Sequence, residues 1–113
     1  MNKVSSKSDF DTAIRSPKIT VAVFKADWCP DCKFIDPFMP EVEEKFANDL
    51  DLIEVDVDNV GTVSEEQNIK GIPSFVAYAD GKELTRYVNK LRKSREEIEH
   101  FLQSAVEVYN KLS

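Results

Sequence analysis

The run Ile-Thr-Val-Ala-Val-Phe-Lys-Ala at residues 19–26 restricts the possible folds of this chain more than any other segment. It is an almost continuous series of β-branched and aromatic residues, which is typical of a strand covered on both faces. Such a strand lies in the middle of a sheet that has helices packed on either side. The segment therefore predicts an α/β fold built around a central sheet.

Helical spacing of apolar residues marks two of the elements around this strand. The segment 6–14 predicts a helix with Ser6 or Ser8 as its N-cap, and the segment 29–48 predicts a longer one. Pro37 lies inside the longer helix and should kink it, and Pro40 should disturb it again. The other elements expected in the first two thirds of the chain are an edge strand at 3–5, a strand at 51–58 and a short helix at 59–68.

The last third of the chain predicts a hairpin followed by a helix. Two strand-like runs within 71–88 flank Asp80-Gly81, a pair typical of a tight hairpin turn. In the helix that follows, Ser94 and Glu97 have the spacing of a capping box. The predicted order is β-α-β-α-β-α-β-β-α, so the central sheet is mixed, with a parallel start and an antiparallel C-terminal hairpin.

Composition limits the partners and the location of the chain. Residues 1–113 are expected to form a single domain, and 42% hydrophobic residues suffice for an ordinary core. The net charge of −6 argues against nucleic acid or an anionic membrane as the main partner. Residues 1–9 hold no apolar run typical of a signal peptide. We expect a cytoplasmic monomer.

The two cysteines of the chain, Cys29 and Cys32, fit a structural disulfide, half of a metal site or a redox pair. A lasting disulfide is disfavoured in the cytosol, and so short a loop gains little from closure. A metal site needs about four ligands, and His100, the single histidine, is expected on the surface of the last helix. A redox pair beside a βαβ pattern is the favoured interpretation.

The pair directly follows the buried strand and begins a helix, where its chemistry is favoured. Cys29 falls near the N-cap, where free N–H groups and the helix dipole stabilise a thiolate. Pro30 suits the first helical position. We therefore expect Cys29 to be the exposed nucleophile and Cys32, one turn later, to be the thiol that resolves the mixed disulfide.

These motifs resemble the thioredoxin family from about Ser8 to Val106. "FKADWCPDCK" is similar to the strand, tryptophan and Cys-x-x-Cys of that family, Pro37 matches its helix-kinking proline, and "KGIPSFVAY" matches its cis-proline loop. The resemblance implies that Trp28 flanks the disulfide, and that Pro73 is cis and faces it. It also implies that the backbone near Ile72 pairs with the substrate.

The resemblance further implies an enzyme that reduces disulfides in protein substrates and binds no cofactor. Reducing equivalents would come from NADPH through a flavin thioredoxin reductase. Two alternatives stay open. One is a related enzyme that reduces small disulfides or is recycled by glutathione. The other is a binding module that senses redox state without catalysis.

Several residues depart from the family pattern at the expected site. Asp31 places a negative charge beside Cys29, either close enough to disfavour its thiolate and make the protein more reducing, or pointing into water. Val23 replaces a buried aspartate thought to move protons to the resolving cysteine, and Glu54 replaces its lysine partner. We expect proton transfer to need Asp31, Glu54 through water, or solvent itself.

The residues expected to line the substrate groove are Lys25, Lys70, Gly71 and Asn89. Lys25, Lys33 and Lys70 are expected to form a small basic rim, or else to be unrelated surface lysines. Asn89 replaces a glycine of the family pattern, so a narrower groove is expected.

Overall fold

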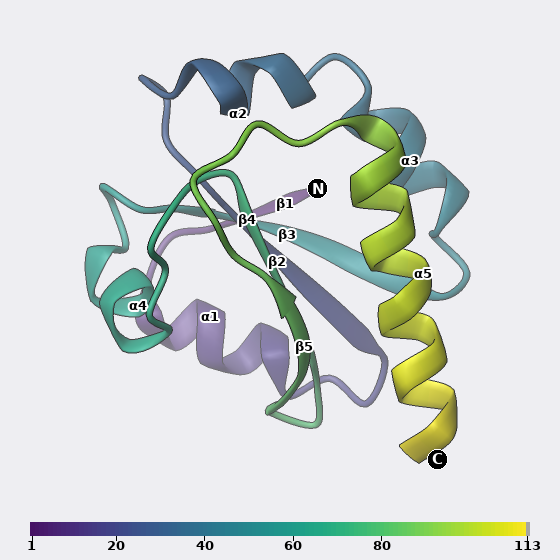
Figure 1. Cartoon of the computed structure of the whole chain (residues 1–113). Coiled ribbons are helices and arrows are strands. Elements are labelled where there is room, and N and C mark those ends of the chain that lie inside the picture. Colours follow the sequence, from purple (N-terminus) through teal and green to yellow (C-terminus); the bar gives the residue numbers. More distant parts are fainter. Residues whose placement is uncertain (113) are drawn as a thin grey trace.

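The computed structural model describes residues 1–112 and has a five-stranded sheet of order β1-β3-β2-β4-β5 (Figure 1). The strands are β1 (Asn2–Val4), β2 (Ile19–Lys25), β3 (Leu50–Asp56), β4 (Ser74–Ala79) and β5 (Lys82–Tyr87). The helices are α1 (Lys7–Ile14), α2 (Pro30–Ile35), α3 (Met39–Lys45), α4 (Gly61–Glu66) and α5 (Arg95–Leu112). The predicted order of elements is confirmed, except that two helices, α2 and α3, follow β2 where a single helix was expected.

The sheet is mixed in the expected way. Strand β3 pairs in parallel with both β1 and β2, whereas β4 runs antiparallel to β2 and to β5. The tight turn between β4 and β5 has positive φ values at Asp80 and Gly81. This conformation is the one that an Asp-Gly hairpin signal predicts.

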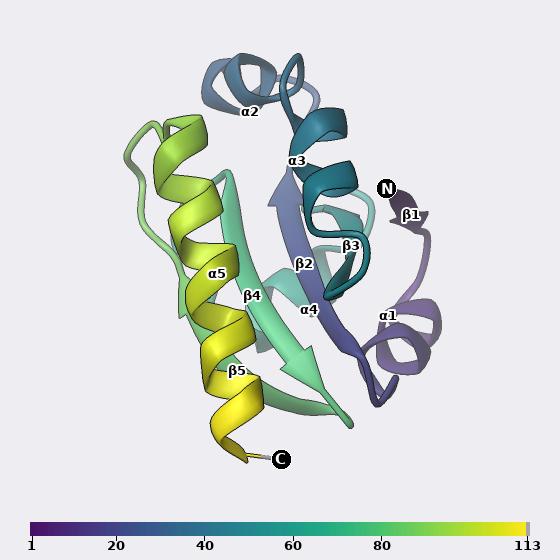
Figure 2. The ribbon, with the colours of Figure 1, turned by 90° about the vertical axis from the view of Figure 1, so that its right-hand side faces the viewer.

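Strand β2 is covered on both faces, as the sequence predicts. Val21 and Val23 point into a core shared with α3 and α5, and Ala22 and Phe24 point into a second core shared with α1 and α4. Figures 1 and 2 show these two helical layers on opposite sides of the sheet. The strand that ends at the cysteine pair is therefore held rigidly between two packed layers.

The predicted caps are confirmed at two helices. Ser6, not Ser8, is the N-cap of α1, and its Oγ accepts a hydrogen bond from Asp9 N at 3.1 Å. At α5 the capping box is complete, because Ser94 Oγ accepts from Glu97 N at 3.1 Å and Ser94 N donates to Glu97 Oε1 at 2.9 Å.

The single kinked helix expected over 29–48 is wrong. The structure has two short helices, α2 and α3, separated by residues 36–38, which include Pro37. Proline removes a helical donor and clashes with the preceding turn, and here the helix ends instead of bending. Pro40 causes no disturbance, because it lies in the first turn of α3, where a missing N–H costs nothing. The helix expected over 59–68 is also shorter.

None of the helices within residues 1–112 is long and apolar enough to cross a membrane.

Candidate active site

The cysteine pair lies where β2 gives way to α2, at the end of the central strand (Figure 1). Cys29 is the N-cap of α2, and Pro30 occupies the first turn. The Cys29 Sγ accepts a hydrogen bond from the Cys32 backbone N–H at 3.1 Å. Such a donor at a helix start favours an anionic sulfur, which is the form that attacks disulfides.

Cys29 is not the exposed thiol that the sequence predicts, since only 4% of its surface is open to solvent. It forms a small apolar cluster with Cys32 and Ala26, and Val57 and Ile72 pack against that cluster. Helical periodicity indicates that Cys29 lies at the start of a helix. It does not show that a loop distant in sequence covers this residue. The nucleophile expected from the sequence is therefore largely covered.

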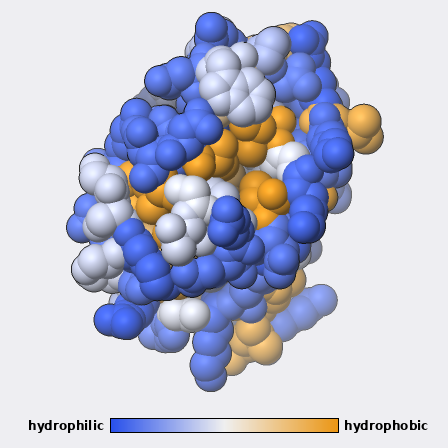
Figure 3. All heavy atoms as spheres, turned by 90° about the vertical axis from the view of Figure 1, so that its left-hand side faces the viewer, coloured by the Kyte–Doolittle hydropathy of each residue, from blue (hydrophilic) through white to orange (hydrophobic). Residues whose placement is uncertain are grey.

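The loop before β4 supplies that cover. The Ile72–Pro73 peptide is cis, and the Cys29 thiol lies 3.8 Å from the Ile72 carbonyl oxygen, to which it donates. Figure 3 shows the face that carries α4 and the start of α2, where hydrophobic residues lie in a hollow ringed by hydrophilic ones. The cysteine pair, the cis-proline loop and the apolar cluster thus meet at one place.

Cys32 is shielded even more completely, with 1% of its surface exposed. Burial raises the pKa of the Cys32 thiol to about 12, and its hydrogen bond with Cys29 acts in the same direction. A hydrogen bond with the Ala26 backbone and, to a smaller extent, the positive charge of Lys25 oppose this shift. Cys32 is therefore a thiol at neutral pH and needs help to react as a thiolate.

Trp28 stands at the rim of the site and is 64% exposed. Its indole Nε1–H donates to Asp58 Oδ2 at 2.8 Å, and Asp58 N in turn donates to Asp56 Oδ1 at 2.8 Å. An exposed tryptophan that is held by a hydrogen bond presents a fixed apolar surface beside the cysteines.

Asp31 is held in an ion pair, an arrangement that the sequence does not suggest. Its Oδ1 accepts a hydrogen bond from Arg92 Nε at 2.9 Å in an ion pair, so it neither points freely into water nor acts as an uncompensated charge beside Cys29. The Arg92 guanidinium also stacks over the Phe34 ring, 4.5 Å from its centroid. The expected electrostatic effect of Asp31 is therefore reduced by a partner 61 residues away in sequence.

Lys25 does not form the expected basic rim with Lys33. Its Nζ lies 2.5 Å from Asp36 Oδ1 and 3.3 Å from Glu54 Oε1, and its side chain is mostly buried. Lys25 and Lys33 line a small cavity together with four carboxylates, those of Asp27, Asp36, Glu54 and Asp56. This part of the molecule is acidic in balance, and Lys25 is occupied by ion pairs.

Val23 and Glu54 are neighbours on β2 and β3, and Val23 is fully buried. Glu54 stands where the family pattern has a lysine, and it is paired with other residues. It pairs with Lys25 at 3.3 Å and, more loosely, with Lys3 at 3.9 Å. The structure thus has a lysine–glutamate pair beside the position where the family pattern has an aspartate–lysine pair.

Gly71, next to the cis-proline loop, lies directly against Asn89. A Cβ added at Gly71 would come within 2.3 Å of the Asn89 carbonyl oxygen, so a side chain at Gly71 has no room. The Asn89 side chain turns into its own loop, where its Oδ1 accepts from Leu91 N at 2.9 Å. Lys70, the remaining expected groove residue, is exposed.

Two residues that contribute to this site were not found from the sequence. Arg92 pairs with Asp31, and Lys93, which is fully buried, lies in the same loop between β5 and α5. Nothing in the run "NKLRKS" distinguishes a buried lysine from its exposed neighbours, because lysine is almost always a surface residue.

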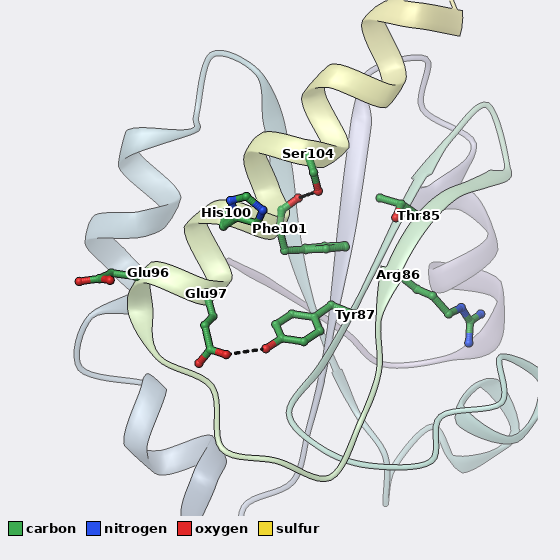
Figure 4. Close-up of a pocket in the computed structure, with 8 residues that line it drawn as sticks. All are labelled: Thr85, Arg86, Tyr87, Glu96, Glu97, His100, Phe101 and Ser104. Carbon is green, nitrogen blue, oxygen red and sulfur yellow. Dashed lines mark hydrogen bonds between the residues drawn. The ribbon is translucent and has the colours of Figure 1, made fainter.

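Within residues 1–112, no group of three or more His, Cys, Asp and Glu residues is placed to hold a metal ion. A pocket of about 580 Å³ lies away from the cysteines, between β5 and α5 (Figure 4). Its lining consists of Thr85, Arg86, Tyr87, Glu96, Glu97, His100, Phe101 and Ser104.

A buried dithiol at the start of a helix, directly after a central strand and beside a cis-proline loop, defines a thiol–disulfide redox protein of the α/β class. Comparison with known proteins agrees. The family model described as Thioredoxin matches residues 1–104. The chain belongs to the thioredoxin family.

Individual relatives and solved structures give the extent of the similarity. The chain is 35% identical to thioredoxin of Coprinus comatus over 86 residues, which cover 75% of this chain and 81% of that protein. It is 33% identical to mitochondrial thioredoxin-2 of Schizosaccharomyces pombe, covering 78% of this chain and 65% of that longer protein. The Plasmodium falciparum thioredoxin structure superposes with a TM-score of 0.77 at 29% identity, covering 96% and 99% of the two chains.

Membership of the family confirms the predicted fold and the predicted class of activity. The chain is a thiol–disulfide oxidoreductase, of the protein-disulfide reductase type. Thioredoxins bind no cofactor of their own and are reduced by NADPH through thioredoxin reductase, as the sequence resemblance implies.

Proposed function

We propose that this chain reduces disulfides in protein substrates by a cycle between the Cys29–Cys32 dithiol and disulfide. The position of the Cys29 sulfur carries the proposal, because it accepts the Cys32 N–H at 3.1 Å and lies 3.8 Å from the Ile72 carbonyl. The first contact stabilises an attacking thiolate. The second contact, in which the thiol donates to the Ile72 carbonyl, supports binding of an extended substrate chain along this backbone edge.

In the proposed cycle, the Cys29 thiolate attacks one sulfur of the substrate disulfide and releases the other as a thiol after protonation. The Cys32 thiolate then attacks Cys29 Sγ, forms the Cys29–Cys32 disulfide and releases the second substrate thiol. Two electrons and two protons pass from the dithiol to the substrate. Trp28, Pro30, Asp31 and Pro73 shape the site in this scheme.

The surroundings of the cysteines define the proposed substrate groove. Ile72 offers its backbone to the substrate, and Gly71 and Asn89 form the adjoining wall, with Lys70 at the exposed margin. Lys25 is held in ion pairs with Asp36 and Glu54, so it offers no free charge to the substrate in this scheme. The narrow fit between Gly71 and Asn89 supports this placement of the wall.

The wider cellular setting is also part of the proposal. Residues 1–113 act as one thioredoxin domain, as a monomer in the cytoplasm, and a flavin thioredoxin reductase that uses NADPH restores the dithiol. The family match and the relatives named thioredoxin support the recycling partner. The net charge of −6 supports a role without nucleic acid.

The test is NADPH consumption with thioredoxin reductase and insulin. Brisk turnover is expected for the wild type and none for Cys29→Ser, while Cys32→Ser should accumulate a mixed disulfide through Cys29. Reduction of the Cys29–Cys32 bridge without insulin turnover would contradict the protein substrate class. A bridge that the reductase leaves oxidised would contradict the recycling partner.

A further inference from the structure

Lys93 is a lysine with no exposed surface, and its environment suits a charged ammonium group. Its Nζ donates to the Leu91 carbonyl at 2.9 Å, to Asn89 Oδ1 at 3.0 Å and to the Asn89 carbonyl at 3.3 Å. It also lies 5.2 Å from the centroid of the Tyr87 ring. Three acceptor oxygens match the three N–H bonds of an ammonium, and an aromatic face attracts a cation.

The loop that carries Lys93 is tied to both sides of the cysteine pair. Arg92 holds Asp31 on α2 at 2.9 Å, and Asn89 packs directly against Gly71, next to the cis-proline loop that covers Cys29. The buried ammonium is therefore set beside the active site by contacts on two elements that also flank the sulfurs.

The nearby carboxylates are engaged by other groups. Asp31 is paired with Arg92, and Glu97 accepts from Ser94 N at 2.9 Å and from the Tyr87 hydroxyl at 3.2 Å, a contact visible in Figure 4. Within residues 1–112, every hydrogen bond of Lys93 Nζ goes to a neutral oxygen. The positive charge of Lys93 thus has no carboxylate in direct contact.

Electrostatics connects this charge to the sulfurs. Burial lowers the pKa of Lys93, and the negative charges of Asp31, Cys32, Glu97 and Cys29 act against that shift. The effect is mutual, so a charged Lys93 favours the thiolate forms of both cysteines. Cys32 is the thiol that needs such help, since burial raises its pKa, and the positive charge of Lys25 already acts on it in the same direction as Lys93 would.

We propose that Lys93 is a positioning residue for the resolving step, in which its buried ammonium stabilises the Cys32 thiolate that attacks Cys29 Sγ. Lys93 keeps its protons throughout. Cys32 loses its proton to solvent, the new Cys29–Cys32 bond forms as the substrate–Cys29 bond breaks, and the departing substrate thiolate takes up a proton. This inference rests on the proposed roles of Cys29 and Cys32.

The test uses the reaction of the reduced protein with Ellman's reagent, followed by thionitrobenzoate release. Attack by Cys29 gives a first, concentration-dependent phase, and attack by Cys32 on the mixed disulfide gives a second, concentration-independent phase. In Lys93→Met the second phase should slow about tenfold at pH 7, and its pH profile should move up by about one unit. A merely structural role would not move the pH profile.

Lys90→Met is the matched control, because Lys90 is an exposed lysine of the same loop. It removes the same charge and should leave both phases unchanged. Circular dichroism of each variant establishes that it is folded. A folded Lys93→Met protein with an unchanged second phase and pH profile would overturn the proposal.

Asn89→Asp provides a second route if Lys93→Met does not fold. It retains Lys93 and places a carboxylate at the oxygen 3.0 Å from Nζ, which should cancel the field of the ammonium. The second phase should slow as in Lys93→Met, and an unchanged second phase would overturn the proposal. Failure of the proposed function has a different signature from failure of this inference. The wild type would then show both phases with Ellman's reagent but no insulin turnover.

Discussion

Single residues decide how strongly charge acts on the cysteine pair, and Asp31 is the clearest case. Asp31 alone would oppose a thiolate at Cys29, but Arg92 binds its carboxylate and also stacks on Phe34. Both interactions hold the guanidinium in place. Its positive charge compensates the Asp31 carboxylate, which would otherwise repel a thiolate at Cys29.

Removal of Arg92 should release the charge of Asp31. In Arg92→Met, the rate of Cys29 alkylation at pH 7 should fall about threefold, as expected for an ion pair of the exposed type. Asp31→Asn alone should change the rate little, and the double variant should recover the wild-type rate.

Arg95→Met is the control for Arg92→Met, since Arg95 pairs with Glu41 and Glu99 instead. A double variant as slow as Arg92→Met would show that the loss does not pass through Asp31.

At this scale the sequence identifies residues whose role depends on their neighbours in the chain. The Cys-x-x-Cys spacing, the helix start at Pro30 and the cis Pro73 all belong to short motifs. Arg92 and Lys93 could not be found in this way. Their contacts depend on how the loop after β5 folds back on α2 and on the cis-proline loop, and no local pattern encodes that path.

At the scale of elements, strands were easier to predict than the helix interrupted by proline. The continuous apolar run at 19–26 and the strand expected at 51–58 each match one strand of the structure, β2 and β3, to within two residues. The region 29–48 carries helical periodicity throughout, but periodicity cannot distinguish a bent helix from two helices that share a face. Residues 36–38, including Pro37, separate α2 from α3, and both helices pack on the same core.

The junction between two loops gives a prediction at the same scale. A methyl group at Gly71 would meet the Asn89 carbonyl at 2.3 Å and Lys90 N at 2.7 Å, and backbone atoms cannot move aside as flexible side chains can. Gly71→Ala should therefore lower the free energy of unfolding by about 2 kcal/mol or more and slow insulin reduction. Urea unfolding measures the first effect.

Gly61→Ala is the matched control for this junction. A Cβ at Gly61 has no atom within 4 Å, and Gly61 begins α4. Because alanine is the better helix former, this variant should be as stable as the wild type or slightly more so. Equal effects of the two substitutions would show that the Gly71–Asn89 contact is not tight in solution.

At the scale of the whole molecule, the cysteine pair is buried where the two packed layers of the fold end. The sheet separates two apolar cores, and the cysteine pair sits at the end of the strand that both cores cover. Composition and the apolar pattern of the strands predict this architecture, because the positions of apolar residues along the chain determine which faces of the strands and helices are buried. The degree to which Cys32 is shielded emerges only from the packing of the cores and loops around it.

This shielding couples the stability of the reduced protein to pH. The pKa of Cys32 rises from an ordinary value of 9.0 to about 12 on folding, chiefly through burial. A folded-state pKa above the unfolded value gives stability that is complete below pH 9 and is lost as the pH rises towards 12. The unfolded chain gives up this proton first, so alkali favours unfolding.

The comparison of the reduced wild type with Cys32→Ala isolates this contribution, because every other titrating group is present in both. Between pH 7 and pH 10 the free energy of unfolding of the wild type should fall by about 1 kcal/mol more than that of the variant. Urea unfolding at the two pH values under strong reductant measures the difference. If both proteins lose stability equally, folding does not raise the pKa of the Cys32 thiol. The resolving step would then not need a nearby cation to stabilise the Cys32 thiolate.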